Sequence, residues 1–168
     1  FLIGAICEKT LELTIPPIYN ANYVLECDAS NRSFGGCLFL CSFSGKSDQV
    51  HLHDENCLRP VAFHSGNFSE SQCKYTILEK ELLSARICMN KWNVFLKCRN
   101  FDWITDNGKL KYINSLKSNN DRMQRWITDI MSYNYRIIQQ PSKKMKISDC
   151  LSRHPKIKTQ ISSLAFDK

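Results

Sequence analysis

Four acidic side chains occupy positions where a metal-dependent reaction could use them. Asp28 ends the run Tyr-Val-Leu-Glu-Cys-Asp, and Asp106 ends the run Phe-Asp-Trp-Ile-Thr-Asp. Glu81 lies inside an apolar helical pattern, and Asp149 opens the final helical pattern directly after Ser148. Clustered carboxylates disfavour each other's ionisation, and hard divalent cations with oxygen ligands, Mg²⁺ above all, relieve that repulsion. If these acids meet, they predict a metal site.

Each acid taken alone also has a structural interpretation. A carboxylate after a strand commonly forms a turn, which applies to Asp28 and Asp106. Asp149 at a helix start complements the helix dipole, and Glu81 alone reads as a partly exposed helix residue. The metal hypothesis therefore requires that the strands ending at Asp28 and Asp106 be neighbours in one sheet, with the helices packed on it.

The elements that must position these acids follow from the hydrophobic pattern. We expect strands over 23–28, 37–43, 60–64, 101–106 and 135–140, and helices over 75–96, 109–116, 122–133 and 148–152. Ser69 or Ser71 is a candidate cap for the turn before the long helix, and Ser148 for the last helix. The order βββ-α-β-α-α-β-α predicts an α/β (mixed α+β) fold with helices layered on a mixed sheet.

The long helix carries a single apolar stripe. Its members recur at helical spacing: Leu78, Leu82, Ala85, Cys88, Met89, Trp92 and Phe95. Glu81 is expected to point toward the core side of this stripe, whereas Glu79 and Lys80 are expected to face water.

Composition narrows the function classes. The 168 residues are 43% hydrophobic, which predicts one globular domain and excludes a disordered chain. A net charge of +7 favours an anionic partner, nucleic acid first, although a solvated basic surface would give the same value. Nine cysteines without a Cys-x-x-Cys pair argue against a zinc ribbon and favour a reducing, intracellular location such as the cytoplasm or the nucleus. No apolar run reaches membrane-spanning length.

Several collinear blocks carry a resemblance to a known family. They are YVLECDASNRSFGGCLFL, RPVAFHSGNFSESQCKYTILEKELLSA, FDWITDNGKLKYI and RMQRWITDIMSYNYRIIQQPSKKMKISDCLSR. Together they span residues 23–153 and resemble the ribonuclease H domain of gypsy-type LTR retrotransposon Pol polyproteins. The resemblance implies a ribonuclease H-like fold with a five-stranded mixed sheet flanked by helices, downstream of a reverse transcriptase.

The resemblance also implies a site and a reaction. Its acids map onto Asp28, Glu81, Asp106 and Asp149, with Glu79 as the alternative to Glu81. The implied activity is two-metal hydrolysis of the RNA strand in an RNA–DNA hybrid, with two Mg²⁺ ions (or Mn²⁺) about 4 Å apart. Asp28 would bridge both ions, Asp149 would complete the nucleophile side, and Glu81 and Asp106 would hold the other ion.

Substrate contacts are expected outside the acid cluster. Asn107 stands where the gypsy-type pattern usually has histidine, and an amide can still contact the hybrid. The other candidates are basic: Arg122, Arg125, Lys143, Lys144 and Lys146. Phosphate contacts position a duplex without reading its bases. The structural alternatives are a core role for the neighbouring Trp126 and a solvated charged loop for Lys143 and Lys144.

The resemblance divides the chain into three parts. Residues 1–21 are expected to connect to an upstream reverse transcriptase, 22–153 to form the ribonuclease H-like domain, and 154–168 to form a polar exit linker. The first residue, Phe1, suggests a fragment of a longer polypeptide.

Two alternatives to a nuclease are a non-catalytic connection module that supports the polymerase and a transposase or integrase core. The position of Asp149 within the DCLSR block disfavours the integrase alternative.

Overall fold

The computed structural model describes residues 22–41, 58–115, 120–141 and 144–153. The expected connecting segment 1–21, the expected exit linker 154–168 and residues 42–57, between the second and third strands, lie outside the described residues. No helix in these four ranges is long and apolar enough to cross a membrane.

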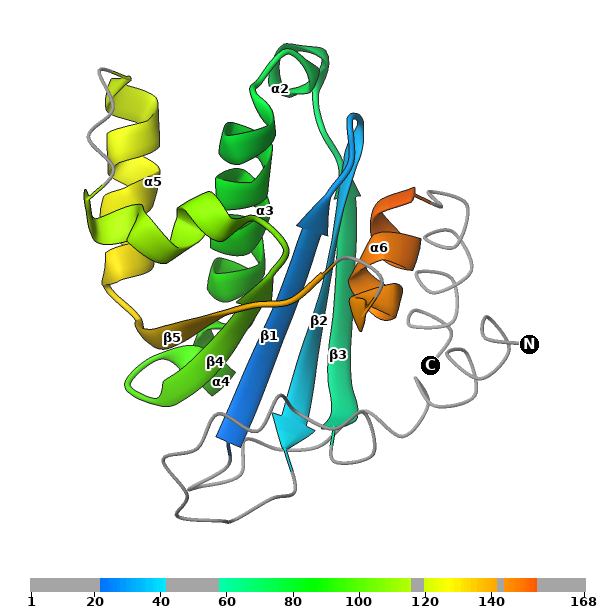
Figure 1. Cartoon of the computed structure of the whole chain (residues 1–168), viewed down its shortest axis with the longest axis vertical. Helices are drawn as coiled ribbons and strands as arrows, with labels where there is room; N and C mark the ends of the chain where they lie inside the picture. The colour runs from blue at the N-terminus through cyan, green and yellow to red at the C-terminus, as the bar shows by residue number, and fades with distance from the viewer. Residues whose placement is uncertain (1–21, 42–57, 116–119, 142–143, 154–168) are drawn as a thin grey trace.

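Five strands form one mixed sheet in the order β3-β2-β1-β4-β5 (Figure 1). Their bounds are β1 Asn22–Ala29, β2 Ser33–Cys41, β3 Leu58–Asn67, β4 Asn100–Thr105 and β5 Asn134–Gln139. The first three strands pair antiparallel as a meander, whereas β4 pairs parallel to both β1 and β5. The predicted α/β fold is confirmed, and the strands that precede Asp106 and contain Asp28 are indeed neighbours.

The helices cover both faces of this sheet (Figure 1). Their bounds are α2 Glu70–Cys73, α3 Ile77–Lys91, α4 Asn93–Leu96, α5 Asp121–Met131 and α6 Lys146–Arg153, and a 3-10 helix, η2, spans Gly108–Ser115. Helix α3 packs on β1 with α5 beside it, and α6 packs on β2 from the other face.

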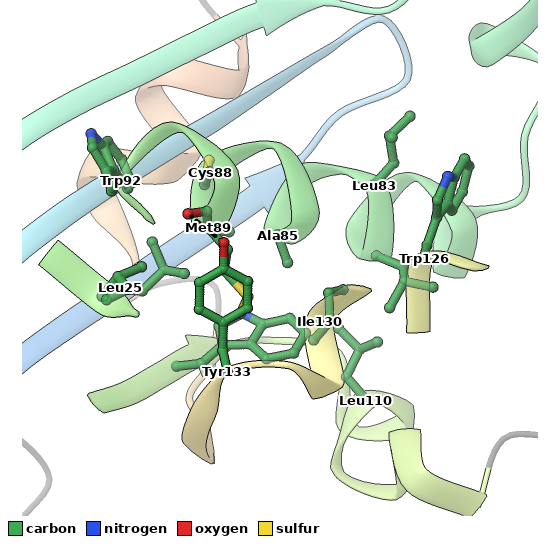
Figure 2. Packing of buried hydrophobic residues seen from close by; sticks show 14 of the residues in the cluster. Leu25, Leu83, Ala85, Cys88, Met89, Trp92, Leu110, Trp126, Ile130 and Tyr133 are labelled. Atoms are coloured by element: carbon green, nitrogen blue, oxygen red, sulfur yellow. Dashed lines mark hydrogen bonds between the residues drawn. The ribbon is translucent and has the colours of Figure 1, made fainter. Parts of the chain in front are cut away.

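Alternation along β1 explains the two cores. Leu25 and Cys27 face the larger cluster, where Figure 2 shows Leu25 near Met89 of α3 and Tyr133, which follows α5. Val24 faces the opposite way, into a smaller cluster that includes Met145 at the start of α6. A strand buried on both faces is what a sheet covered by helices on both sides requires.

Three local expectations were wrong. The long helix stops at Lys91, because Trp92 leaves helical geometry (φ −104°, ψ 27°) before the short α4. Ser148 does not cap the last helix, which begins at Lys146; Ser148 is fully buried inside it. Glu79 and Lys80 do not face water, since they are only 8% and 6% exposed.

Candidate active site

Three of the predicted acids meet at one edge of the sheet. Asp28, Glu81 and Asp106 each offer a carboxylate oxygen, and the three oxygens lie within 4.8 Å of one another. Asp28 is near the end of β1 and Asp106 directly follows β4. Because these strands are parallel neighbours, their carboxyl ends meet at the same edge. Glu81 reaches this edge from α3.

Helix α3 is fastened to the strand end beside the acids. The Ser84 hydroxyl donates to the backbone carbonyl of Asp28 at 3.3 Å, and Ser84 has no exposed surface. Ser84 lies one turn beyond Glu81 on the same helix, so this bond fixes the height of Glu81 relative to Asp28.

The acids repel one another in the absence of a cation. Burial, followed by the charges of Asp28 and Asp106, raises the pKa of Glu81 to about 9. Burial also raises the pKa of Asp28. The hydrogen bond from Ser152 acts in the opposite direction, and the charges of Asp106 and Asp149 add to the rise. Carboxyl groups whose pKa values are raised by burial and by like charges are suited to a bound cation. Three carboxylates also match the hard oxygen ligands that Mg²⁺ takes.

Asp149 lies beside this trio rather than within it. Its charge acts on Asp28, so the two carboxylates are near each other. Its Oδ1 accepts a hydrogen bond from Arg153 Nε at 2.5 Å, one turn later on α6. The structure therefore brings Asp28, Glu81 and Asp106 together and leaves Asp149 adjacent, in an ion pair with Arg153.

Glu79 has a different environment from Glu81. Its carboxylate accepts hydrogen bonds from Arg122 at 2.7 Å and Asn120 at 3.0 Å, and from the backbone and hydroxyl of Thr76, both at 2.9 Å. Burial alone would raise the pKa of Glu79, but the bonds from Thr76 and Arg122 outweigh it and lower the pKa. Glu79 thus caps α3 and joins it to α5, whereas Glu81 is the glutamate in the acid cluster.

Comparison with known proteins agrees with this arrangement. The family model described as the RNase H-like domain found in reverse transcriptase matches residues 19–133. The chain belongs to this family. The resemblance seen in the sequence blocks is therefore confirmed.

Curated relatives of this RNase H-like domain are retrotransposon polyproteins. The Tf2-3 and Tf2-4 transposon polyproteins of Schizosaccharomyces pombe are each 28% identical to it over 150 residues, which is 84% of this chain. The chain spans only 10% of the length of those polyproteins.

Solved structures share the fold of the RNase H-like domain. The foamy viral protease-reverse transcriptase in complex with dsDNA matches 74% of this chain and 24% of its own, with a TM-score of 0.55 and 15% identity. LC11-RNase H1 in complex with an RNA/DNA hybrid matches 77% of this chain and 93% of its own, with a TM-score of 0.54 and 13% identity. Identities this low establish the fold alone.

The residues predicted to contact nucleic acid have diverse environments in the RNase H-like domain. Asn107 Oδ1 accepts the backbone N–H of Lys109 at 3.1 Å. Arg122 pairs with Glu79, and its guanidinium lies 4.0 Å from the centre of the Tyr75 ring, which assigns it to the α3–α5 contact. Arg125 is exposed on α5.

The lysines before the final acid are only partly described. Lys144 is exposed, whereas Lys143 and the side chain of Lys146 lie outside the described residues. The neighbouring Trp126 is 8% exposed and belongs to the larger core. Its ring lies 5.8 Å from that of Tyr75, in keeping with the core interpretation of this residue.

Sequence reasoning missed two residues beside the acids. Ser152 donates a hydrogen bond to Asp28 Oδ2 at 2.5 Å, and Glu26 accepts hydrogen bonds from Ser148. The alternation of β1 did place Glu26 on the same side as Asp28, which was the available signal for Glu26. Nothing in the local pattern around Ser152 points to Asp28.

Proposed function

We propose that this chain is a metal-dependent endonuclease that hydrolyses the RNA strand of RNA–DNA hybrids during reverse transcription of a retroelement. The observation that carries the proposal is the convergence of Asp28, Glu81 and Asp106 within 4.8 Å at one sheet edge. A module that only supports a polymerase has no need for three mutually repelling acids. Family membership and the retrotransposon relatives supply the biological setting.

The acids would hold the metal ions. Asp28 would bridge two Mg²⁺ ions, Asp149 would complete one site, and Glu81 and Asp106 would complete the other. The chemistry that bound Mg²⁺ supplies is activation of the attacking water and stabilisation of the leaving 3′-oxygen. No side chain of this domain then needs to act as the nucleophile.

The chain's own residues preorganise this site. Ser84 and Ser152 fix the backbone and the carboxylate of Asp28, respectively. Burial of Glu81 keeps its carboxyl away from bulk water, so that its pKa is near 9 until positive charge arrives. Asp149 would exchange its partner Arg153 for a cation, because a divalent ion attracts a carboxylate more strongly than an exposed guanidinium does.

The substrate proposal rests on charge and fold. A net charge of +7 suits a polyanionic partner. LC11-RNase H1, which shares the fold, has a crystal structure in complex with an RNA/DNA hybrid. Recognition of a hybrid would depend on helix shape and on RNA 2′-hydroxyls. Exposed Arg125 and Lys144 are candidates for phosphate contacts, with Lys143 and Lys146 proposed from sequence.

Cleavage of a labelled hybrid tests the proposal. The chain, joined to its reverse transcriptase, should cut the RNA strand in Mg²⁺ or Mn²⁺ and leave single-stranded RNA and duplex DNA intact. Chelation by EDTA should stop the reaction, and added metal should restore it. Hybrid binding without any metal-dependent cleavage would instead favour the non-catalytic connection module.

A further inference from the structure

A serine near the end of the last described helix, α6, bonds directly to the carboxylate of Asp28. The Ser152 hydroxyl donates to Asp28 Oδ2 at 2.5 Å, and Ser152 is only 1% exposed. The backbone carbonyl of the same residue accepts hydrogen bonds from the hydroxyl of Ser30, at 2.8 Å, and from that of Ser33. Ser152 is therefore held by the β1–β2 turn while it holds Asp28.

The geometry assigns the Ser152 proton to Asp28. A hydroxyl has one hydrogen to donate, and Ser152 Oγ also lies 2.9 Å from the carbonyl of Asp149. The carboxylate oxygen is both closer and more negative, so it is the stronger acceptor. The carbonyl of Ser152 lies in the last turn of α6, where backbone carbonyls have no hydrogen-bond donor within the helix. The hydroxyls of Ser30 and Ser33 donate to it instead.

The other end of α6 is fixed independently. Glu26 Oε1 accepts the backbone N–H of Ser148 at 3.1 Å and its hydroxyl at 2.7 Å, and Glu26 is 5% exposed. The close approach of α6 to Gly35 adds a steric constraint, because a Cβ there would lie 2.5 Å from the Ser148 carbonyl oxygen. Since α6 stays attached through Glu26 and Gly35, removal of the Ser152 hydroxyl should leave the helix in place.

We propose that Ser152 is a positioning residue that fixes the orientation of the Asp28 carboxylate and thereby preorganises the metal site. This inference rests on the proposed metal-dependent function. Ser152 binds neither metal nor substrate; it acts through Asp28 by occupying Oδ2 and limiting rotation of the carboxylate. Partners that orient a metal ligand typically affect metal affinity about 10–100-fold.

Titration calorimetry with Mg²⁺ and with Mn²⁺, in the absence of nucleic acid, tests the inference without relying on turnover. Ser152→Ala should weaken the affinity about tenfold. Tyr133→Phe is the control, because it also removes one buried hydroxyl that donates a hydrogen bond, but to the backbone carbonyl of Met89, away from the acids. Both variants should lose thermal stability to a similar extent, and only Ser152→Ala should lose metal affinity.

A conservative variant guards against a purely structural explanation. Ser152→Thr keeps the hydroxyl and should recover most of the affinity that Ser152→Ala loses. If Ser152→Ala binds metal as tightly as the unmodified chain, or if Tyr133→Phe loses as much affinity, the positioning role is wrong while the proposed nuclease stands. If the unmodified chain binds neither ion and cleaves no hybrid, the proposed function fails and this inference fails with it.

Discussion

Glu79 and Glu81 are two residues apart on α3, yet the carboxylate of Glu79 pairs with Arg122 at 2.7 Å and that of Glu81 joins Asp28 and Asp106. The helix turns these neighbours to different sides, one toward α5 and the other toward the end of β1. Two glutamates in the same turn of one helix thus have pKa values shifted in opposite directions, and substitution should separate their roles.

Replacement of the two glutamates by glutamine should have opposite effects. Glu81→Gln should abolish metal binding but stabilise the metal-free domain at neutral pH, because glutamine is neutral when buried without having to take up a proton on folding. Glu79→Gln should preserve metal binding but destabilise the domain by about 1 kcal/mol, since it weakens the bonds to Arg122 and Thr76. Calorimetric titration measures the metal affinity of each variant, and urea unfolding measures its free energy of unfolding. Loss of metal affinity in Glu79→Gln alone would reverse the assignment.

Stability of the metal-free domain should fall as pH rises. The pKa of Glu81 is about 9 in the folded state and 4.5 for an unperturbed glutamate, so the unfolded state releases this proton first. The contribution of Glu81 to the free energy of unfolding therefore decreases from about pH 4.5 to about pH 9 and is constant outside that window.

Unfolding by urea in EDTA across that window measures the slope. The difference in unfolding free energy between Glu81→Gln and the unmodified chain should grow with pH. Taking this difference cancels the contributions of the other titrating groups, which both proteins share. Saturating Mg²⁺ should reduce that difference. A difference that is independent of pH would show that Glu81 is ionised in the metal-free domain at neutral pH.

Asp28→Asn should lower hybrid cleavage more than about a hundredfold. The amide keeps the size of the side chain but lacks the charge that two cations would share. The Asp28→Asn variant should keep the fold, because burial and neighbouring acids already disfavour the charged form of Asp28. Cleavage rate and circular dichroism are the two measurements. Near-normal turnover would rule out the bridging role of Asp28.

Gly35→Ala should displace α6. The added Cβ would lie 2.5 Å from the Ser148 carbonyl oxygen and 2.7 Å from the Ser152 backbone nitrogen, atoms that cannot rotate away. The expected loss is about 1–3 kcal/mol in unfolding free energy, with weaker metal binding. Gly108→Ala is the control, because the atoms nearest to its Cβ would be those of the Gln139 side-chain amide, which ends a flexible side chain. Equal stability of the two variants would contradict a tight α6 contact.

Arg125→Ala and Lys144→Ala should each weaken hybrid binding. Each should also reduce the slope of the logarithm of the binding constant against the logarithm of salt concentration by about one, as expected for the loss of one phosphate contact. Both side chains are exposed, so the fold should be unaffected. Arg122→Ala should instead lower stability, because Arg122 pairs with Glu79 and stacks on Tyr75. Binding titrations at several salt concentrations, with thermal unfolding alongside, distinguish the two classes. An unchanged salt dependence in Arg125→Ala would remove that residue from the interface.

Local patterns predicted the strands and the direction of Glu81, because both depend on side-chain periodicity along one element. The burial of Glu79 was not predictable in this way, since Arg122 and Asn120 are 43 and 41 residues further along the chain. The start of α6 was misjudged for a similar reason: Ser148 resembles a cap by composition, but its hydroxyl bonds to Glu26 across 122 residues. Contacts between distant elements leave no periodic signal.

The separation between Asp28 and Ser152 has a consequence for biosynthesis. They are 124 residues apart, and α6 is the last of the described elements to leave the ribosome. The larger core, formed by β1, α3 and α5, contains no residue of α6 and can condense before α6 is made. A nascent domain would therefore be compact before its site is complete, because Asp28 gains the Ser152 hydrogen bond only after α6 has been made.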